Sequence, residues 1–344
     1  LPQMQLNEDE EGYQANVVSC QNHIKSLWIY QHLKTSRRPA PKIEKQPNFI
    51  IILNVLAITG LLGCKVFFKE GLFMKTKNTV ISQINGRVGI LTFNRPHVLN
   101  AFNGALISET NEIMDRFIKD DTILAIVVNG AGRCFSAGFD MKESAARGTS
   151  SEAEWRDVLT KDFDFIMQFW NAPKPTIAAA HRYCIGGAME LLMACDLAVA
   201  GETTRFGEPE VRFGSGIVAM LAPYVIGPKH AKELLLTGND KITADRCYQM
   251  GILNQVVADG KEMEAALELA NQIVSAAPLS VQRTKTAIHR AYELAEMRTA
   301  LREALEIDIN IESYESPERR EFNRIRKEQG LKAALTWRDQ NAAG

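Results

Sequence analysis

From residue 74 onward, apolar positions alternate between the spacing of a strand and the spacing of a helix. The segment TVISQINGRVGILTF holds two β-rich runs around Asn85-Gly86, which predicts a hairpin with a type I′ turn. After Asn103, a residue that can cap a helix, apolar residues recur at helical spacing. The run TILAIVV predicts a buried strand, and EWRDVLTKDFDFIMQFW predicts another helix. This alternation is typical of an α/β domain with layered sheets.

The pattern changes near residue 260, after which the chain is helical. KEMEAALELANQIVSAA and a long stretch after Pro278 both have helical spacing, and Ser316 with Pro317 predicts the start of a last helix. The sequence therefore predicts an α/β core over residues 74–260 and a helical C-terminal region over residues 261–344.

Residues 1–73 differ from the rest and are expected to form a poorly structured extension. Residues 49–64 carry no charge, but a helix of that length spans only about 24 Å of a roughly 30 Å hydrocarbon core. Counting to residue 68 reaches about 30 Å, although Lys65 must then extend toward the interface. Two interpretations stay open: a membrane anchor over residues 49–68, and a read-through or mis-called extension before Met74. In both cases we expect residues 1–73 to be dispensable for activity.

Composition narrows the function. Hydrophobic residues make up 46% and charged residues 24%, which is typical of a globular protein with a sizeable core. The balance of 40 basic to 41 acidic residues gives no excess of positive charge for nucleic acid or an anionic membrane. The six cysteines and six histidines are scattered, so we expect reduced thiols and no metal site. The expected location is cytoplasmic, with a mitochondrial or membrane-tethered protein as the alternative.

The segment CIGGAMELLMACDLAVA places Glu190 in apolar surroundings, where a charged carboxylate costs several kcal/mol unless it is paired or its pKa shifts. Gly186 and Gly187 open the helix that follows, and glycine allows main chain to approach a ligand closely. The free N–H groups of that helix would point at the same place, which suits an oxyanion. A tight strand-to-helix turn with a first-turn glutamate explains the segment equally well on its own.

Two more segments help to distinguish an oxyanion site from a simple strand-to-helix turn. FSAGFDMKE follows a strand and turns at Gly138, which leaves the N–H of Phe139 free to point inward. Two such donors on one carbonyl oxygen are typically worth ~3 kcal/mol each to a transition state. RFGEPEVRFG holds Glu208 and Glu210 around Pro209, and the proline stiffens the loop. Together, Glu190 and Glu210 would form a pair for general acid/base catalysis.

Read in order, these segments resemble the enoyl-CoA hydratase/isomerase (crotonase) family over about residues 75–339. FNRPHVLNAF is similar to the NRP-x-x-x-NA segment of that family. GAGRCFSAGFDMKE resembles its first oxyanion loop and YCIGGAMELLMACDLAVA its second. FGEPEVRFG matches F-G-x-P-E, and GLKAAL resembles the C-terminal G-x-x-A-[FL]. Five matches in one order are far more specific than any one of them.

The resemblance implies a spiral of ββα units with a C-terminal trimerisation region, and therefore a homotrimer or hexamer. Apolar stripes in the C-terminal helices agree with that expectation: Ala300, Leu301, Ala304, Leu305, Ile307 and Ile309. The resemblance also implies an acyl-CoA thioester substrate, with no cofactor beyond the coenzyme A of that substrate. The thioester oxygen would lie between the N–H groups of Phe139 and Gly187. The implied substrate-binding positions are Ala137, Phe139, Asp140, Met141, Lys142, Gly186 and Lys285, the last near the phosphates unless it is a solvated helix lysine.

The resemblance further implies that Glu190 and Glu210 hold a water and add it across the 2,3 double bond of a 2-enoyl-CoA. We assign Glu190 to the water and Glu210 to Cα, and expect the pair to share both roles. One alternative is an enoyl-CoA isomerase, which commonly keeps only the second glutamate. Another is a non-catalytic acyl-CoA-binding protein, which an apolar residue at either position would have indicated. A serine hydrolase is not supported, because FGSGI does not fit G-x-S-x-G.

Overall fold

The computed structural model describes residues 78–341, so the predicted extension and its apolar segment 49–68 lie outside the described residues. The described residues belong to one compact unit of the chain. Of the helices between residues 78 and 341, none combines the length and the apolar character needed to span a lipid bilayer.

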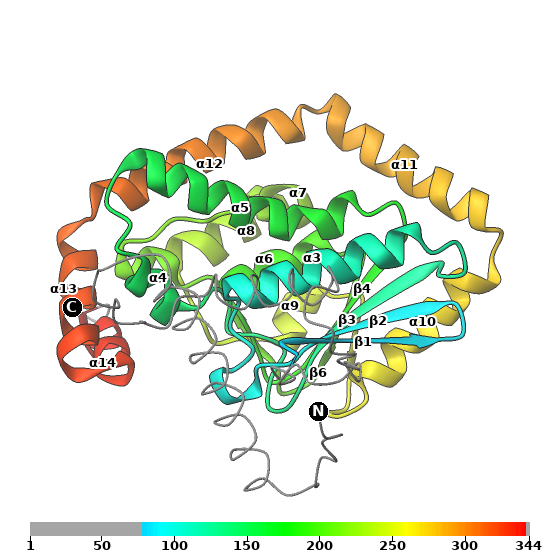
Figure 1. Ribbon diagram of the computed structural model, residues 1–344, viewed down its shortest axis with the longest axis horizontal. Helices are drawn as coiled ribbons and strands as arrows, with labels where there is room; N and C mark the ends of the chain where they lie inside the picture. The colour runs from blue at the N-terminus through cyan, green and yellow to red at the C-terminus, as the bar shows by residue number, and fades with distance from the viewer. Residues whose placement is uncertain (1–77, 342–344) are drawn as a thin grey trace, which may run out of the picture. The chain divides into compact units, whose positions relative to one another are not determined.

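A six-stranded sheet forms the centre of this unit, in the order β1-β2-β3-β4-β6-β9 (Figure 1). The first two strands are antiparallel and every later neighbour is parallel. Their bounds are β1 (Val80–Asn85), β2 (Val88–Phe93), β3 (Ala125–Gly130), β4 (Thr176–Ala180), β6 (Leu197–Gly201) and β9 (Gln255–Val257). Because parallel strands share one direction, the loops after β3 and β4 leave from the same edge of the sheet.

The predicted hairpin is present, but its turn is one residue further along the chain. Asn85 pairs with Val88, so the two-residue loop is Gly86-Arg87 and not Asn85-Gly86. Only Gly86 has a positive φ, of 59°. Glycine at the first loop position is typical of a type II′ turn, so the predicted type I′ turn was wrong.

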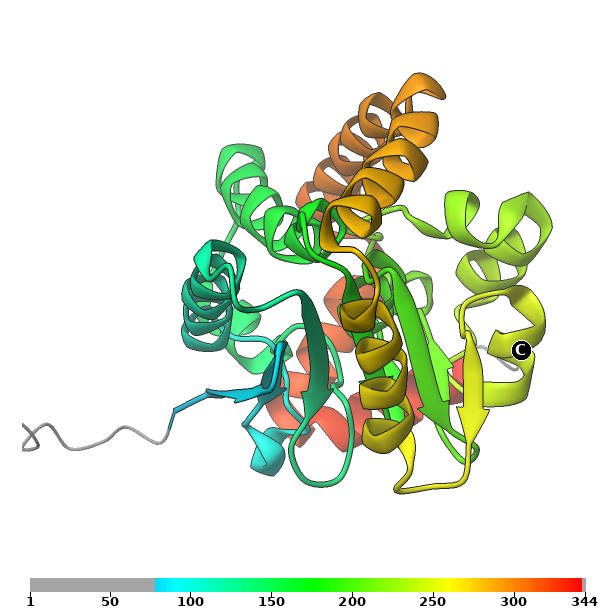
Figure 2. The same cartoon turned by 90° about the vertical axis from the view of Figure 1, so that its right-hand side faces the viewer.

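Helices cover both faces of the sheet. The helix α10 (Glu262–Ser275) packs along one face, against apolar side chains of β2, β3, β4 and β6 (Figure 2). The opposite face carries the larger core, with α3 (Gly104–Lys119), α5 (Glu152–Asn171) and α6 (Gly187–Ala194). As predicted, Asn103 caps α3, its side chain accepting from Leu106 N. Since α10 covers the core sheet, the helical region after residue 261 begins inside the core rather than beyond it.

Shorter elements complete the core. A second sheet contains β5 (Tyr183–Ile185), β7 (Arg205–Gly207) and β8 (Ile242–Thr243). The remaining helices of this part are η1 (Pro96–Val98), α4 (Met141–Arg147), η2 (Glu210–Phe213), α7 (Ala222–Val225), α8 (Gly227–Thr237) and α9 (Ala244–Met250).

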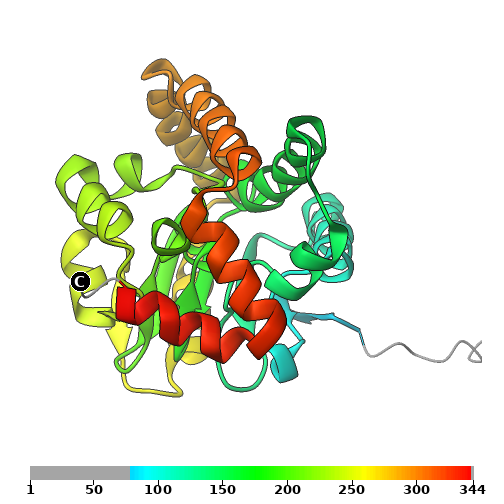
Figure 3. The ribbon, with the colours of Figure 1, turned by 90° about the vertical axis from the view of Figure 1, so that its left-hand side faces the viewer.

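Four helices form the C-terminal region: α11 (Pro278–Leu294), α12 (Met297–Tyr314), α13 (Pro317–Gln329) and α14 (Leu331–Asn341). The helix α12 runs beside α5, and α13 and α14 turn back across the side of the molecule (Figures 1 and 3). Three residues of the predicted oligomerisation stripe, Leu301, Leu305 and Ile309, are buried within the chain. Their apolar character is therefore explained without a second subunit, whereas Ile307 is 62% exposed.

Candidate active site

The turn at Gly138, in the loop after β3, leaves the Phe139 amide free. The N–H groups of Ala137 and Asp140 donate to carbonyl oxygens of Leu99 and Phe102 at 3.0 and 2.9 Å, and that of Gly138 donates to Ser136 Oγ in the same loop at 3.1 Å. The N–H of Phe139 has no acceptor among residues 78–341. Gly138 has a φ of 78°, a conformation that other residues rarely adopt. The turn at Gly138 thus satisfies its neighbours and leaves the Phe139 amide available to a ligand.

A second free amide begins α6. Gly186 has a φ of 61° and precedes the helix, whose first residue is Gly187. Within the described part of the chain, the N–H of Gly187 also has no acceptor, as expected at a helix N-terminus. A Cβ on Gly138 would lie 3.0 Å from Gly187 N, so the two loops are in contact. Two unsatisfied donors therefore lie in adjoining turns, which is the arrangement predicted for an oxyanion site.

The two loops are held together by backbone and by an aromatic ring. Ser136 N donates to Tyr183 O at 3.2 Å, and Ile185 N donates to Ser136 O at 3.3 Å. The ring of Phe139 lies against Gly187, where any Cβ would come within 2.4 Å of it. Glycine at 187 is thus required by the position of the Phe139 side chain.

The NRP-x-x-x-NA segment braces the first loop. The Arg95 guanidinium is 2.9 Å from the Asp140 carboxylate, which also accepts the first amides of α4. Asn100 is fully buried, and its Nδ2 donates to three carbonyl oxygens in residues 131–135 at 2.8 to 3.1 Å. Sequence reasoning did not predict these contacts. Burial of an asparagine is the sign that would have indicated these contacts, because a buried asparagine needs several hydrogen-bond partners.

Glu190 is the first of two predicted catalytic glutamates, and it is 1% exposed. Its Oε2 accepts a hydrogen bond from Ala219 N at 2.5 Å. Burial and then the charge of Glu210 raise the pKa of Glu190 well above its usual range. A carboxyl group held this way is a proton donor near neutral pH.

Glu210 is the second predicted catalytic glutamate. It begins η2 directly after Pro209, and its Oε1 lies so close to Gly186 that a Cβ there would be 2.5 Å away. Burial raises the pKa of Glu210 to about 7. The structure therefore brings the two predicted glutamates to the same glycine turn that carries the free amides.

Two further carboxyl groups join this region, and sequence reasoning assigned neither a role. Glu208 is fully buried, and Asp308, on α12, is 2% exposed. Among the described residues, no hydrogen-bond partner is found for either oxygen of these groups. Asp308 lies against Gly216, and burial followed by the charge of Glu312 raises its pKa to about 8. A charged residue in the stiff FGEPE turn was a local sign of Glu208, whereas the position of Asp308 depends on how α12 folds back.

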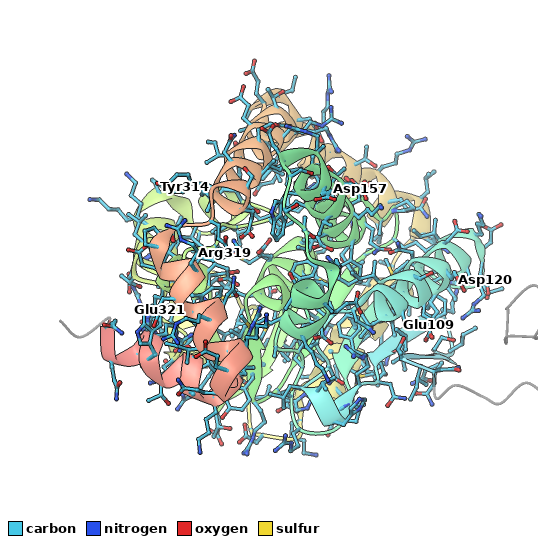
Figure 4. All side chains as sticks on the ribbon, turned by 60° about the vertical axis from the view of Figure 1, so that its left-hand side comes forward. Glu109, Asp120, Asp157, Tyr314, Arg319 and Glu321 are labelled. Atoms are coloured by element: carbon cyan, nitrogen blue, oxygen red, sulfur yellow. The ribbon has the colours of Figure 1, made fainter. Side chains whose placement is uncertain are left out.

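The ion pair of Glu312 and Arg319 closes this region from the C-terminal side. Glu312 accepts from Ser215 Oγ and pairs with Arg319 of α13. Arg319 lies on α13 (Figure 4), and its guanidinium also lies over the Trp155 ring, 5.1 Å from the ring centroid. The C-terminal helices therefore pack directly against the loop after Glu210.

Other predicted substrate-binding residues lie on the first loop. The Met141 side chain packs on a small apolar cluster of α13 and α14, and its carbonyl accepts from Arg326 at 3.0 Å. Lys142 is exposed, and Ala137 is half-buried beside the free amide. These positions contribute backbone to the edge of the site, while the Asp140 carboxylate is already occupied by Arg95 and α4.

Within the chain, Lys285 does not lie near the two glycine loops. Its Nζ is 2.5 Å from Asp196 Oδ2, and it is buried rather than solvated as the alternative interpretation required. Asp196 precedes β6 and accepts the N–H of Thr176 at the start of β4. The glycine loops follow the carboxyl ends of β3 and β4, so Lys285 lies at the opposite end of the sheet. Its role near the phosphates stays a prediction.

Comparison with known proteins gives consistent matches. Residues 83–322 match the family model described as Enoyl-CoA hydratase/isomerase. The "Probable enoyl-CoA hydratase, mitochondrial" of Dictyostelium discoideum is 36% identical over 227 residues, which cover 64% of this chain and 79% of that protein. The "Short-chain-enoyl-CoA hydratase" of Clostridium acetobutylicum is 34% identical over 230 residues, covering 65% and 85%.

A solved structure extends the similarity to the fold. The enoyl-CoA hydratase/isomerase from Xanthobacter autotrophicus Py2 is 42% identical and superposes with a TM-score of 0.75, covering 76% of this chain and 98% of that one. The α/β fold described above is therefore of the crotonase type, and the family match extends from β1 into α13.

Proposed function

Because the chain belongs to the enoyl-CoA hydratase/isomerase family, we propose that it adds water across the 2,3 double bond of a 2-enoyl-CoA thioester. The main support is the occurrence of two glutamates, the buried Glu190 and the half-buried Glu210, beside two amides without acceptors among residues 78–341, Phe139 and Gly187. Coenzyme A enters as part of the substrate, and the reaction needs no separate cofactor.

The free amides would bind the thioester oxygen. When the water oxygen bonds to Cβ, electron density moves through the double bond onto that oxygen, and charge develops there. Donors that are fixed in advance stabilise such charge without reorganising, and each contributes typically ~3 kcal/mol. The dipole of α6 adds to this effect because its positive end lies at Gly187.

The glutamate pair would move the protons. Hydration requires a base for the water and an acid for Cα, and a pair that shares one negative charge supplies both. Burial raises the pKa of both glutamates, that of Glu190 well above its usual range and that of Glu210 to about 7, so both groups can exchange a proton near neutral pH. In this proposal Glu210 begins as the base and Glu190 as the acid, which reverses the individual roles assigned from sequence. Dehydration is the reverse of hydration, so the group that acts as the acid in one direction would act as the base in the other.

The test is turnover by the purified full chain with short 2-enoyl, branched, aryl and 3-enoyl thioesters. A hydratase converts a 2-enoyl-CoA into a 3-hydroxyacyl-CoA, and in H₂¹⁸O the hydroxyl group carries the label. Conversion of a 3-enoyl-CoA into a 2-enoyl-CoA without label uptake would identify an isomerase instead. Binding of acyl-CoA without any turnover would identify a non-catalytic member.

We also propose that the protein assembles as a trimer or as paired trimers, the assembly that the family resemblance implies. Apolar side chains exposed on α11 and α12 support this: Leu279, Ile288, Leu294, Ile307 and Ile311. Sedimentation at micromolar concentration tests it, and a monomer would contradict it.

A further inference from the structure

Glu208 is a buried carboxyl group next to the proposed acid/base pair, and the reaction described above does not use it. Its side chain is fully buried, and neither of its oxygens has a hydrogen-bond partner among residues 78–341. An ionised carboxylate in such a place would lack both water and a counter-ion, which costs several kcal/mol. The neutral carboxylic acid avoids this cost, and it also carries a proton that can be donated.

The groups around Glu208 are acidic or neutral. Glu210 lies in the same turn, separated from Glu208 by Pro209, while the charge of Glu190 on α6 raises the pKa of Glu208 and the charge of Glu208 raises that of Cys184 on β5. Asp308 on α12 acts on both Glu190 and Glu210.

Two more charged groups face the turn from the C-terminal helices. Glu312 of α12 and Arg338 of α14 both act on Glu210. The Arg338 guanidinium is already 2.7 Å from Asp240 and 2.7 Å from Asp339. The positive charge of Arg338 is therefore shared with two other carboxylates.

Glu210 has a matching vacancy in its hydrogen bonding. Its Oε2 is buried and, within the described residues, lacks a partner. One hydrogen bond from the Glu208 hydroxyl to this oxygen would satisfy a buried group on each side. The interaction between the two side chains lowers the pKa of Glu210 and raises that of Glu208, as expected when Glu208 is the donor.

We propose that Glu208 is a positioning residue that remains protonated and donates a hydrogen bond to the Glu210 carboxylate, so that Glu210 carries the single negative charge of the three glutamates when substrate arrives. This inference rests on the proposed hydration, because it specifies which member of the pair starts as the base. Glu208 need not touch the substrate, and its proton is not consumed in the reaction.

The experiment compares Glu208→Gln with Glu208→Met in the full chain, measuring kcat/KM for a short 2-enoyl-CoA from pH 5 to pH 9. Glutamine keeps a donor, so its acidic limb should stay within a few tenths of a pH unit of the wild-type limb. Methionine has a similar length but no donor, so Glu210 should become harder to ionise. Its acidic limb should move up by about one unit, with roughly tenfold lower kcat/KM below that limb.

Two outcomes overturn the proposal. If both variants move the limb to lower pH, Glu208 is an ionised neighbour that repels Glu210. If the methionine variant folds and leaves the limb unchanged, Glu208 is only a packed side chain. Glu262→Met is the matched control, since Glu262 is buried at the start of α10 and caps Gly260 N there. It should not move the limb.

An infrared measurement keeps the proposal testable if the methionine variant does not fold or if the wild type shows no hydration. The difference spectrum between wild type and Glu208→Gln at pH 7 should contain the C=O stretch of a carboxylic acid. A carboxylate band in its place contradicts the proposal. Because this readout needs no turnover, it separates failure of this inference from failure of the proposed function.

Discussion

Two carboxyl groups, one at each end of α6, have pKa values that are shifted in opposite directions, and the Asp196 side chain is 21% exposed whereas Glu190 is 1% exposed. Beyond its C-terminal end, Asp196 is surrounded by donors: Lys285 Nζ at 2.5 Å, Thr176 N at 2.7 Å and His289 Nε2 at 3.7 Å. Burial alone would raise the pKa of Asp196, but hydrogen bonding to His289 and the charge of Lys285 lower it. In the first turn of the same helix, Glu190 has one backbone donor and its pKa is raised.

The comparison distinguishes a carboxylate that stabilises the structure from a carboxyl group that can exchange a proton. A carboxylate with cationic partners is fixed in one protonation state, which suits a link between strands and helices. A carboxyl group without them can exchange a proton near neutral pH, at a cost in stability. Eight residues of α6 are enough to separate the two environments.

The largest effect is expected at the unpaired end. Glu190→Gln and Glu210→Gln should each lower kcat by at least ~10²-fold, because each removes a group that exchanges a proton with substrate or water. Asp196→Asn is the control, and it should keep kcat within a few-fold in whatever fraction is folded. Circular dichroism checks that all three variants fold. Full turnover by Glu190→Gln with an inactive Glu210→Gln would point to isomerisation.

The oxyanion donor at Gly187 gives the next largest effect, but a direct substitution is confounded by Phe139. Any Cβ at position 187 meets that ring, so both changes are made in a Phe139→Ala background. There, Gly187→Pro lacks the N–H and Gly187→Ala keeps it, while proline is tolerated at the first position of a helix. We expect kcat to be about 10²-fold to 10³-fold lower in the proline variant than in the alanine variant. Equal rates would mean that this amide does not stabilise the transition state.

How far the sequence predicts the site depends on how local each part is. The Glu190 and Glu210 positions, the turns at Gly138 and Gly186 and the cap at Asn103 are all encoded within a few residues, and the structure brings these segments together as expected. The burial of Leu301, Leu305 and Ile309 against α5 was not predicted, because an apolar stripe does not reveal which surface covers it. Their helix could have packed on a second subunit equally well.

The acidic surroundings of the pair illustrate the same limit. Asp308 lies more than a hundred residues after Glu190 in the sequence, and its effect on that group arises only because α12 folds back over the loop at Gly216. Lys285 shows the same limit, because its burial beside Asp196 was not predicted. A lysine on a helix indicates a phosphate site or a solvated surface, and no local signal indicates that Asp196 will meet it at the far end of the sheet.

At the end of α6 where Asp196 pairs with Lys285, we expect substitutions to change the free energy of unfolding. Lys285→Met leaves the partly exposed Asp196 carboxylate without its main cation, and the loss of a hydrogen bond between charged groups costs about 2 kcal/mol. The double variant Lys285→Met/Asp196→Asn should recover part of this loss, since no unpaired charge remains. Urea unfolding measures both.

The same variants decide whether Lys285 also binds the phosphates of coenzyme A. If it does, Lys285→Met should raise KM for the full acyl-CoA but not for an acyl-pantetheine, which lacks the nucleotide phosphates. If KM rises for neither, Lys285 serves only the ion pair with Asp196. Comparing the two thioesters with one protein preparation removes any effect of partial unfolding.

A smaller effect on stability should appear as pH dependence at Asp308. Its pKa is raised to about 8 in the folded chain, because of burial and then the charge of Glu312, and the unfolded value is close to 4. A group raised in this way binds more protons when folded, so its contribution to stability is complete below about pH 4 and is lost as the pH rises through about 8. Asp308→Asn stays neutral, so this loss should disappear. Between pH 6 and pH 8 the free energy of unfolding should fall by about 2 kcal/mol less in the variant than in the wild type. Asp115→Asn, at an exposed position on α3, is the control and should follow the wild type. Parallel curves for wild type and Asp308→Asn would mean that Asp308 is ionised when folded, and the contrast between the two ends of α6 would then not extend to α12.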